Sequence, residues 1–121
     1  VMGMATFGKN MKLTVDRAQR DRLQLVMTEA LGCRSIEPKE GLTVFALADG
    51  FSIGVYWVEA SQALADDDQA LAAWLEICVD DVAKTHDALL AKQVAVVPYP
   101  VDPEHTYYQL PGGPVFRLAR A

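Results

Sequence analysis

Met11-Lys12-Leu13-Thr14-Val15-Asp16 alternates apolar and polar side chains and ends on an acidic residue. The same pattern returns 64 residues later as Leu75-Glu76-Ile77-Cys78-Val79-Asp80. Such alternation predicts a strand with one buried face, and an aspartate at its end is a favoured start for a helix. The recurrence of both signals predicts that the chain contains one structural unit twice.

A helix is expected after each of these strands, because apolar residues recur there at helical spacing. In the first half they are Leu23, Val26, Met27, Ala30 and Leu31, with Gly32 as the residue that ends the helix. In the second half, Asp80 or Asp81 precedes a stripe that consists of Val82, His86, Leu89 and Leu90.

Further strands complete each unit. Residues 42–47 and 51–58 flank the turn signal Asp49-Gly50, and residues 106–110 and 115–119 flank Pro111-Gly112-Gly113-Pro114. Another strand is expected at 94–97, before a proline-rich loop at 98–103. We therefore predict an α+β fold of two strand–helix–three-strand modules within a single domain, 1–121. The first module covers about 8–58, a solvated connector about 59–72, and the second module about 73–121.

Composition limits the function classes. The 121 residues are 51% hydrophobic and carry a net charge of −5, and the acidic excess falls entirely in residues 62–121. An acidic chain does not predict nucleic-acid binding, which needs a basic footprint. The sequence has no apolar run of about 20 residues and no signal-peptide pattern at Val1 to Asn10, so we expect a cytoplasmic protein without membrane contact. Two cysteines, Cys33 and Cys78, predict neither a disulfide framework nor a zinc site.

Two segments carry a resemblance to a known family. They are Trp74 to Val82 with the helix after it, and the terminal hairpin Tyr107 to Leu118. Together with the internal repeat, they resemble the vicinal oxygen chelate superfamily, also called the glyoxalase/bleomycin-resistance family, over about residues 8–121. The resemblance implies tandem βαβββ modules that form a cavity between curved mixed sheets. It also implies a homodimer.

The metalloenzymes of this family place one metal ligand on the first and one on the last strand of each module. In this sequence those positions correspond to Asn10, Gly54, Trp74 and Arg117. Glycine has no side-chain donor atom, the indole only donates a hydrogen bond, and arginine is a permanent cation. We therefore expect no metal of the family type, and no other cofactor.

Strand alternation assigns a cavity face if those four positions point inward. The face then carries the candidate ligand-binding residues, which are Asn10, Lys12, Tyr56, Trp74, Glu76 and Arg117. The opposite face is apolar throughout and is expected to pack under the helices. An alternative is that Lys12, Glu76 and Arg117 pair with one another while Trp74 fills the cavity as core. The sequence leaves open which rings face the cavity, among Phe45, Trp57, Tyr99, Tyr107 and Tyr108.

A face with two aromatic rings and both signs of charge suits an organic ligand with a planar part. We expect a metal-independent small-molecule binding protein that sequesters an aromatic or cationic antibiotic or metabolite. The alternative is a lyase, isomerase or dioxygenase of the same superfamily that uses Glu76 as general base, with Lys12 or Arg117 stabilising an oxyanion. The two histidines favour neither: His86 is expected in the core or at its boundary, and His105 at the surface, with a role in gating a ligand as the alternative.

Overall fold

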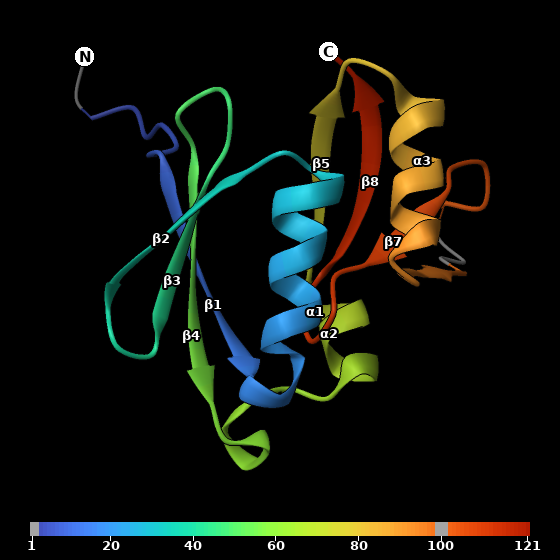
Figure 1. Ribbon diagram of the computed structural model, residues 1–121. Coiled ribbons are helices and arrows are strands. Elements are labelled where there is room, and N and C mark those ends of the chain that lie inside the picture. The colour runs from blue at the N-terminus through green and yellow to red at the C-terminus, as the bar shows by residue number, and fades with distance from the viewer. Residues whose placement is uncertain (1–2, 99–101) are drawn as a thin grey trace.

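Two mixed four-stranded sheets form the framework of the protein (Figure 1). The computed structural model describes residues 3–98 and 102–121. The first sheet has the order β1-β4-β3-β2, with bounds Asn10–Asp16, Ser52–Val58, Leu42–Ala46 and Arg34–Lys39. The second has the order β5-β8-β7-β6, with bounds Trp74–Val79, Val115–Arg120, Tyr107–Gln109 and Ala95–Val97. The outer pairs β1–β4 and β5–β8 are parallel, and the others are antiparallel. Both modules therefore share one βαβββ topology, as the repeat predicts.

In each module an aspartate at or just after the end of the first strand starts the helical segment that follows. Asp16 accepts a hydrogen bond from the backbone of Ala18 at the 3-10 turn η1 (Arg17–Gln19), which leads into α1 (Arg20–Leu25). The last turn of this helix is a π-helical segment, η2 (Val26–Ala30), after which Gly32 takes φ 71°. In the second module Asp81 caps α3 (Val82–Ala91) through the backbone N–H of Lys84.

Three elements lay outside the sequence prediction. Strand β2 was not located, because it is an edge strand with five exposed residues and contains Pro38, so it has no apolar alternation. The connector was expected to be a solvated linker, but it contains η3 (Ala60–Gln62) and α2 (Asp66–Ala72). Gln69 of α2 is buried and donates a hydrogen bond from Nε2 to the carbonyl of Gly112, at 3.2 Å. This contact holds the connector against the second module.

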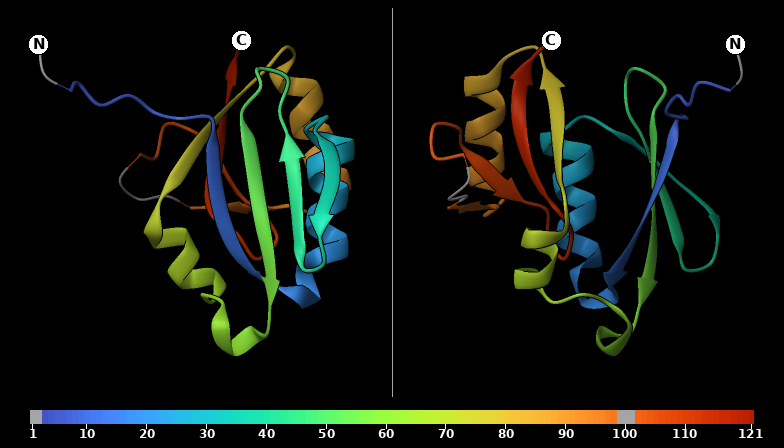
Figure 2. Two further views of the ribbon diagram at one scale, coloured as in Figure 1. Left: turned by 90° about the vertical axis from the view of Figure 1, so that its left-hand side faces the viewer. Right: turned by 180° about the vertical axis from the view of Figure 1, so that it is seen from behind.

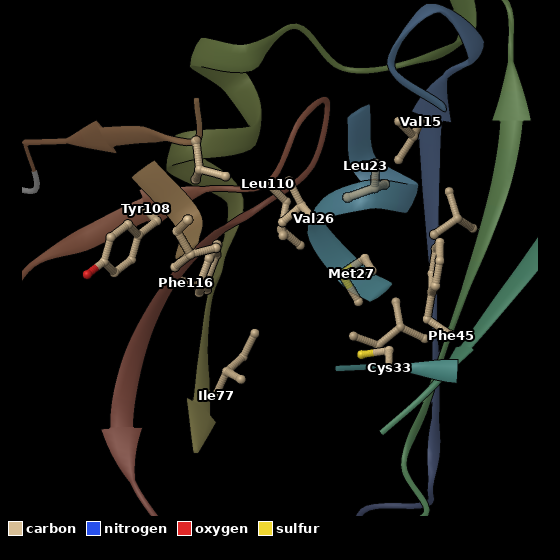
Figure 3. Close-up of a cluster of buried hydrophobic side chains, with 14 of the residues drawn as sticks. Val15, Leu23, Val26, Met27, Cys33, Phe45, Ile77, Tyr108, Leu110 and Phe116 are labelled. Carbon is tan, nitrogen blue, oxygen red and sulfur yellow. The ribbon is translucent and has the colours of Figure 1, made fainter. Parts of the chain in front are cut away.

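The first helix lies between the two sheets (Figures 1 and 2). Leu23, Val26 and Met27 are each 1% exposed and belong to one hydrophobic cluster that draws on both modules. Figure 3 shows Phe45 and Cys33 of the first module on one side of these residues, with Tyr108 and Phe116 of the second on the other. The two modules thus share a single core.

Strand alternation places the remaining side chains as predicted. Val15, Ile53, Ile77 and Phe116 belong to the core, and Met11, Leu13, Leu75 and Leu118 pack against it. Their sequence neighbours therefore lie on the opposite side of each sheet, which we call its open face. Because both covered faces converge on one core, the two open faces lie on the outer sides of the molecule.

Among the described residues, every helix falls short of the length and apolar character that a bilayer span requires.

Candidate functional site

Arg117 is the centre of a polar cluster on the open face of the second sheet. It lies opposite Glu76 of β5 and opposite Tyr107 of β7 in the strand register. Its Nη2 donates to Glu76 Oε2 at 3.2 Å, and its Nη1 donates to Asp102 Oδ2 at 3.3 Å. The guanidinium also stacks over the Trp74 ring, 4.5 Å from the ring centroid. Below, the Arg117 cluster means Trp74, Glu76, Asp102, His105, Tyr107 and Arg117.

Asp102 joins the loop before β7 to this cluster. The Tyr107 hydroxyl donates to its Oδ2 at 2.6 Å, and His105 Nδ1 lies 2.8 Å from the same oxygen. These two hydrogen bonds, that from Tyr107 first, hold the pKa of the Asp102 carboxyl below its ordinary value. The bond to Asp102 is also the largest cause of a raised pKa at Tyr107. The carboxylate is therefore ionised and fixed beside the guanidinium.

The aromatic part of the cluster is open to a ligand. Trp74 is 40% exposed and meets Tyr107 edge to face, with ring centroids 5.9 Å apart. Beside them lies a hollow of about 310 Å³, lined by Val96, Val97, Pro98, Pro103, His105, Thr106 and Tyr107. The site thus offers an exposed indole, an apolar recess and two carboxylates for one arginine.

The open face of the first sheet has a different character. Lys12 lies across Gly54, where an added Cβ would meet Lys12 Nζ at 2.7 Å. Lys39 Nζ lies 5.7 Å from the ring centroid of Tyr56. Arg34 is on this face too, because it pairs with Ala46, which pairs with Ser52. The face is therefore cationic.

The predicted site residues divide between the two faces. Trp74, Glu76 and Arg117 come together in the Arg117 cluster. Asn10, Lys12 and Tyr56 lie on the other sheet, and the strands of one chain do not bring the two groups together. The alternative was that Lys12, Glu76 and Arg117 pair with one another while Trp74 is buried. Only one part of it is found, the ion pair between Glu76 and Arg117. Trp74 is exposed, and Lys12 has no ion pair within the described residues.

Sequence reasoning missed Asp102 as a site residue and favoured a surface role for His105 over a role in gating a ligand. His105 is exposed, yet it is bound to Asp102, and the spacing of three residues between them was the available signal. Of the rings left open, Tyr107 lies on the open face because it pairs with Arg117. Phe45, Trp57 and Tyr108 belong to the core, and Tyr99 lies outside the described residues.

His86 lies at the edge of the core, where its Nδ1 is 2.7 Å from the hydroxyl of Tyr108.

The residues at the family's metal-ligand positions do not fit a divalent metal. Lys12 lies over the Gly54 position, and Arg117 lies over the Trp74 ring, so a cation already occupies each half of the set. Asn10 alone has a side chain that can donate an oxygen to a metal. Residues 3–98 and 102–121 contain no group of three or more histidine, cysteine, aspartate or glutamate side chains that could hold a metal ion.

Comparison with known proteins identifies the fold. No family model and no curated protein sequence matches the chain. Among solved structures, a putative glyoxalase family protein from Bacillus anthracis matches with a TM-score of 0.69 at 14% identity, covering 98% of this chain and 97% of that one. The fosfomycin resistance protein FosX from Mesorhizobium loti matches with a TM-score of 0.67 at 14% identity, over 100% and 93%. Leishmania major glyoxalase I gives 0.67 at 15% identity, over 96% and 87%.

Proposed function

We propose that this chain, which has the fold of the vicinal oxygen chelate superfamily, is a metal-independent small-molecule binding protein. The observation that carries the proposal is the Arg117 cluster, where an exposed indole is held in place by a guanidinium. A planar ligand can stack on such a ring, and sites for organic ligands combine apolar walls with a few fixed polar groups. Two carboxylates against one arginine favour an aromatic cation as the ligand.

The proposed assembly is a homodimer with the ligand between two chains. Within the described residues, β1 and β5 are edge strands, each paired on one side only, and both open faces point outward. The open face of the first sheet carries the cations Lys12, Arg34 and Lys39. The carboxylate of Asp16, at the end of β1, accepts a hydrogen bond from the backbone of η1. The Arg117 cluster has an excess of carboxylate. Opposite charge on the two faces favours contact between the first sheet of one copy and the second sheet of another.

Fluorescence titration tests the binding proposal, and the emission of the bound dye is followed so that the signal does not depend on Trp74. Berberine serves as the aromatic cation and 8-anilinonaphthalene-1-sulfonate as an aromatic anion. We expect saturable binding of the cation, weakened about tenfold or more in Trp74→Ala, since loss of the stacking surface costs about 1.4 kcal/mol or more. Leu71→Ala, at an apolar residue that is 84% exposed on α2, is the matched control and is expected to bind normally. Equal affinity in both variants would refute the site.

An enzyme of the same fold is the second candidate, and one observation favours it. His105 donates a hydrogen bond from Nδ1 to the carboxylate of Asp102, which orients the imidazole. This leaves Nε2 of His105 available for proton transfer. Glu76, by contrast, is engaged with Arg117 and would have to break that ion pair to act as a base. Turnover of a bound ligand that His105→Gln abolishes, with binding retained, would establish the enzyme.

A further inference from the structure

We propose that the N-terminal arm of one chain, residues 3–9, docks on the second sheet of another copy of the chain. The Phe7 ring enters the recess beside Trp74 and Tyr107, and the Lys9 ammonium lies against the carboxylates of the Arg117 cluster. This contact rests on the proposed binding function, because the arm fills the site proposed for the ligand.

The arm stands clear of its own chain. Residues 3–10 are all exposed; Phe7 is fully exposed and Met4 is 83% exposed. The base of the arm is fixed, because the backbone N–H of Ser52 donates to the carbonyl of Lys9 at 2.8 Å. A phenylalanine side chain in water forgoes the free energy that burial would supply. The arm is therefore suited to a contact that the described part of its own chain does not provide.

A second copy is the occupant of the recess because the arm and the recess of one chain lie apart. Figure 1 and the right-hand view of Figure 2 show the arm beside the first sheet and the loop that precedes β7 beyond the second, with α1 between them. The proposed dimer sets the first sheet of one copy against the second sheet of the other, and the arm continues directly into β1 of that first sheet. Fully extended, residues 3–9 span roughly 23 Å, which exceeds the width of a four-stranded sheet at about 4.8 Å per strand.

The recess matches one aromatic side chain. Its volume of about 310 Å³ is at the lower limit for pockets that hold drug-sized molecules. Two valines and two prolines form most of its wall, and Tyr107 brings the exposed Trp74 ring to its side. A phenylalanine ring seated there would bury its apolar surface and lie next to other aromatic rings.

The charges of the arm and of the Arg117 cluster are complementary. Lys9 has no ion pair within the part of the chain that the structure describes. The cluster has two carboxylates against one guanidinium, and the Glu76 side chain is 45% exposed. A ring followed two residues later by an ammonium group is also the chemistry proposed for the ligand, an aromatic cation. The arm thus carries the groups that the site favours.

Photocrosslinking of the full chain tests the contact, with p-benzoylphenylalanine in place of Phe7. Chains labelled with ¹⁴N and ¹⁵N are mixed, so that mass spectrometry separates links between chains from links within one chain. We expect links between chains to the peptides that line the recess, which contain Val96 to Pro98 or Pro103 to Tyr107. The same reagent in place of Leu71, which is 84% exposed, is the matched control and should not give these links. Links within one chain, links to other peptides, or a yield no higher than that of the control would overturn the proposal.

A serine substitution measures what the ring contributes to self-association. Phe7→Ser leaves the fold of the chain intact, because the ring is fully exposed in it. We expect the dissociation constant of the dimer, measured by sedimentation equilibrium, to rise about tenfold or more, as for aromatic residues that anchor an interface. Leu71→Ser removes an equally exposed apolar side chain and should change the constant less than about twofold. Equal effects of the two substitutions would contradict the contact.

Berberine titration separates this contact from the proposed function. Because the arm competes for the site, Phe7→Ser should bind berberine about threefold or more tightly than the wild type does. Unchanged berberine affinity together with absent crosslinks would refute the arm contact and leave the ligand site in place. Crosslinks between chains without any berberine binding would instead refute the aromatic cation as the ligand and leave the arm as the occupant.

Discussion

Replacement of Leu23 by alanine tests whether the two modules share one core. Leu23 is 1% exposed and lies on α1 between the two sheets. A leucine-to-alanine change at such a site costs about 3 to 5 kcal/mol, because the lost burial and the cavity that remains both count. Unfolding entropy near 2.1 cal/mol/K per residue gives about 0.25 kcal/mol/K for the 121 residues, so the melting temperature should fall by about 12 °C or more.

The assay follows each module separately during urea unfolding. Trp57 lies in β4 of the first module and Trp74 in β5 of the second, so 5-fluorotryptophan labelling gives one ¹⁹F resonance for each. Because the core is shared, both resonances should move to the same lower midpoint in Leu23→Ala. Leu71→Ala, at an 84% exposed position, should leave the free energy of unfolding within about 0.5 kcal/mol of wild type. Two separate midpoints, or a cost below about 1 kcal/mol, would refute the shared core.

Three further predictions concern the two cysteines, the carboxyl group of Asp102 and the assembly. Burial raises the pKa of Cys33 to about 11, whereas Cys78 is exposed, so a thiol reagent at pH 8 should modify only Cys78, as peptide mass spectrometry would show. The lowered pKa of Asp102 means that its contribution to stability is full above the ordinary aspartate pKa of about 3.9 and is lost as pH falls through the folded-state value. The stability difference between wild type and Asp102→Asn, measured by urea unfolding, should therefore be constant from about pH 6 to about pH 4 and shrink at lower pH, and a difference that stays constant throughout would contradict the assignment. Sedimentation equilibrium should show a dimer that Lys39→Glu weakens, because the change reverses a charge on the cationic open face; an unaltered dimer would count against the proposed contact.

Strand alternation was enough to predict most of the fold and which of the candidate site residues share a face. Met11 to Asp16 and Leu75 to Asp80 sorted their side chains between covered and open faces because strand residues alternate without exception in these two segments. Trp74, Glu76 and Arg117 were brought together by that alternation and by the register of β5 with β8.

The parts that escaped prediction depend on tertiary contacts. Asp102 lies in a loop that brings it next to Arg117 of β8, and no periodic pattern in the sequence indicates this contact. The helix α2 was not expected because its buried residue is the polar Gln69, which is satisfied by a carbonyl 43 residues away. The placement of α1 between the sheets, which separates the two groups of predicted site residues, follows from packing between modules rather than from the pattern of either one.

A thermal-shift measurement on the purified protein tests the central proposal, that the open face of the second sheet binds an organic ligand without a metal. Divalent Ni, Zn, Mn, Fe and Co are compared with aromatic cations, each with wild type and Trp74→Ala. A ligand at about 100 times its dissociation constant stabilises by about 2.7 kcal/mol, which corresponds to roughly 10 °C at this chain length. We predict such a shift with an aromatic cation, lost in Trp74→Ala, and none with the metals. A shift with a metal that a chelator abolishes would contradict the account.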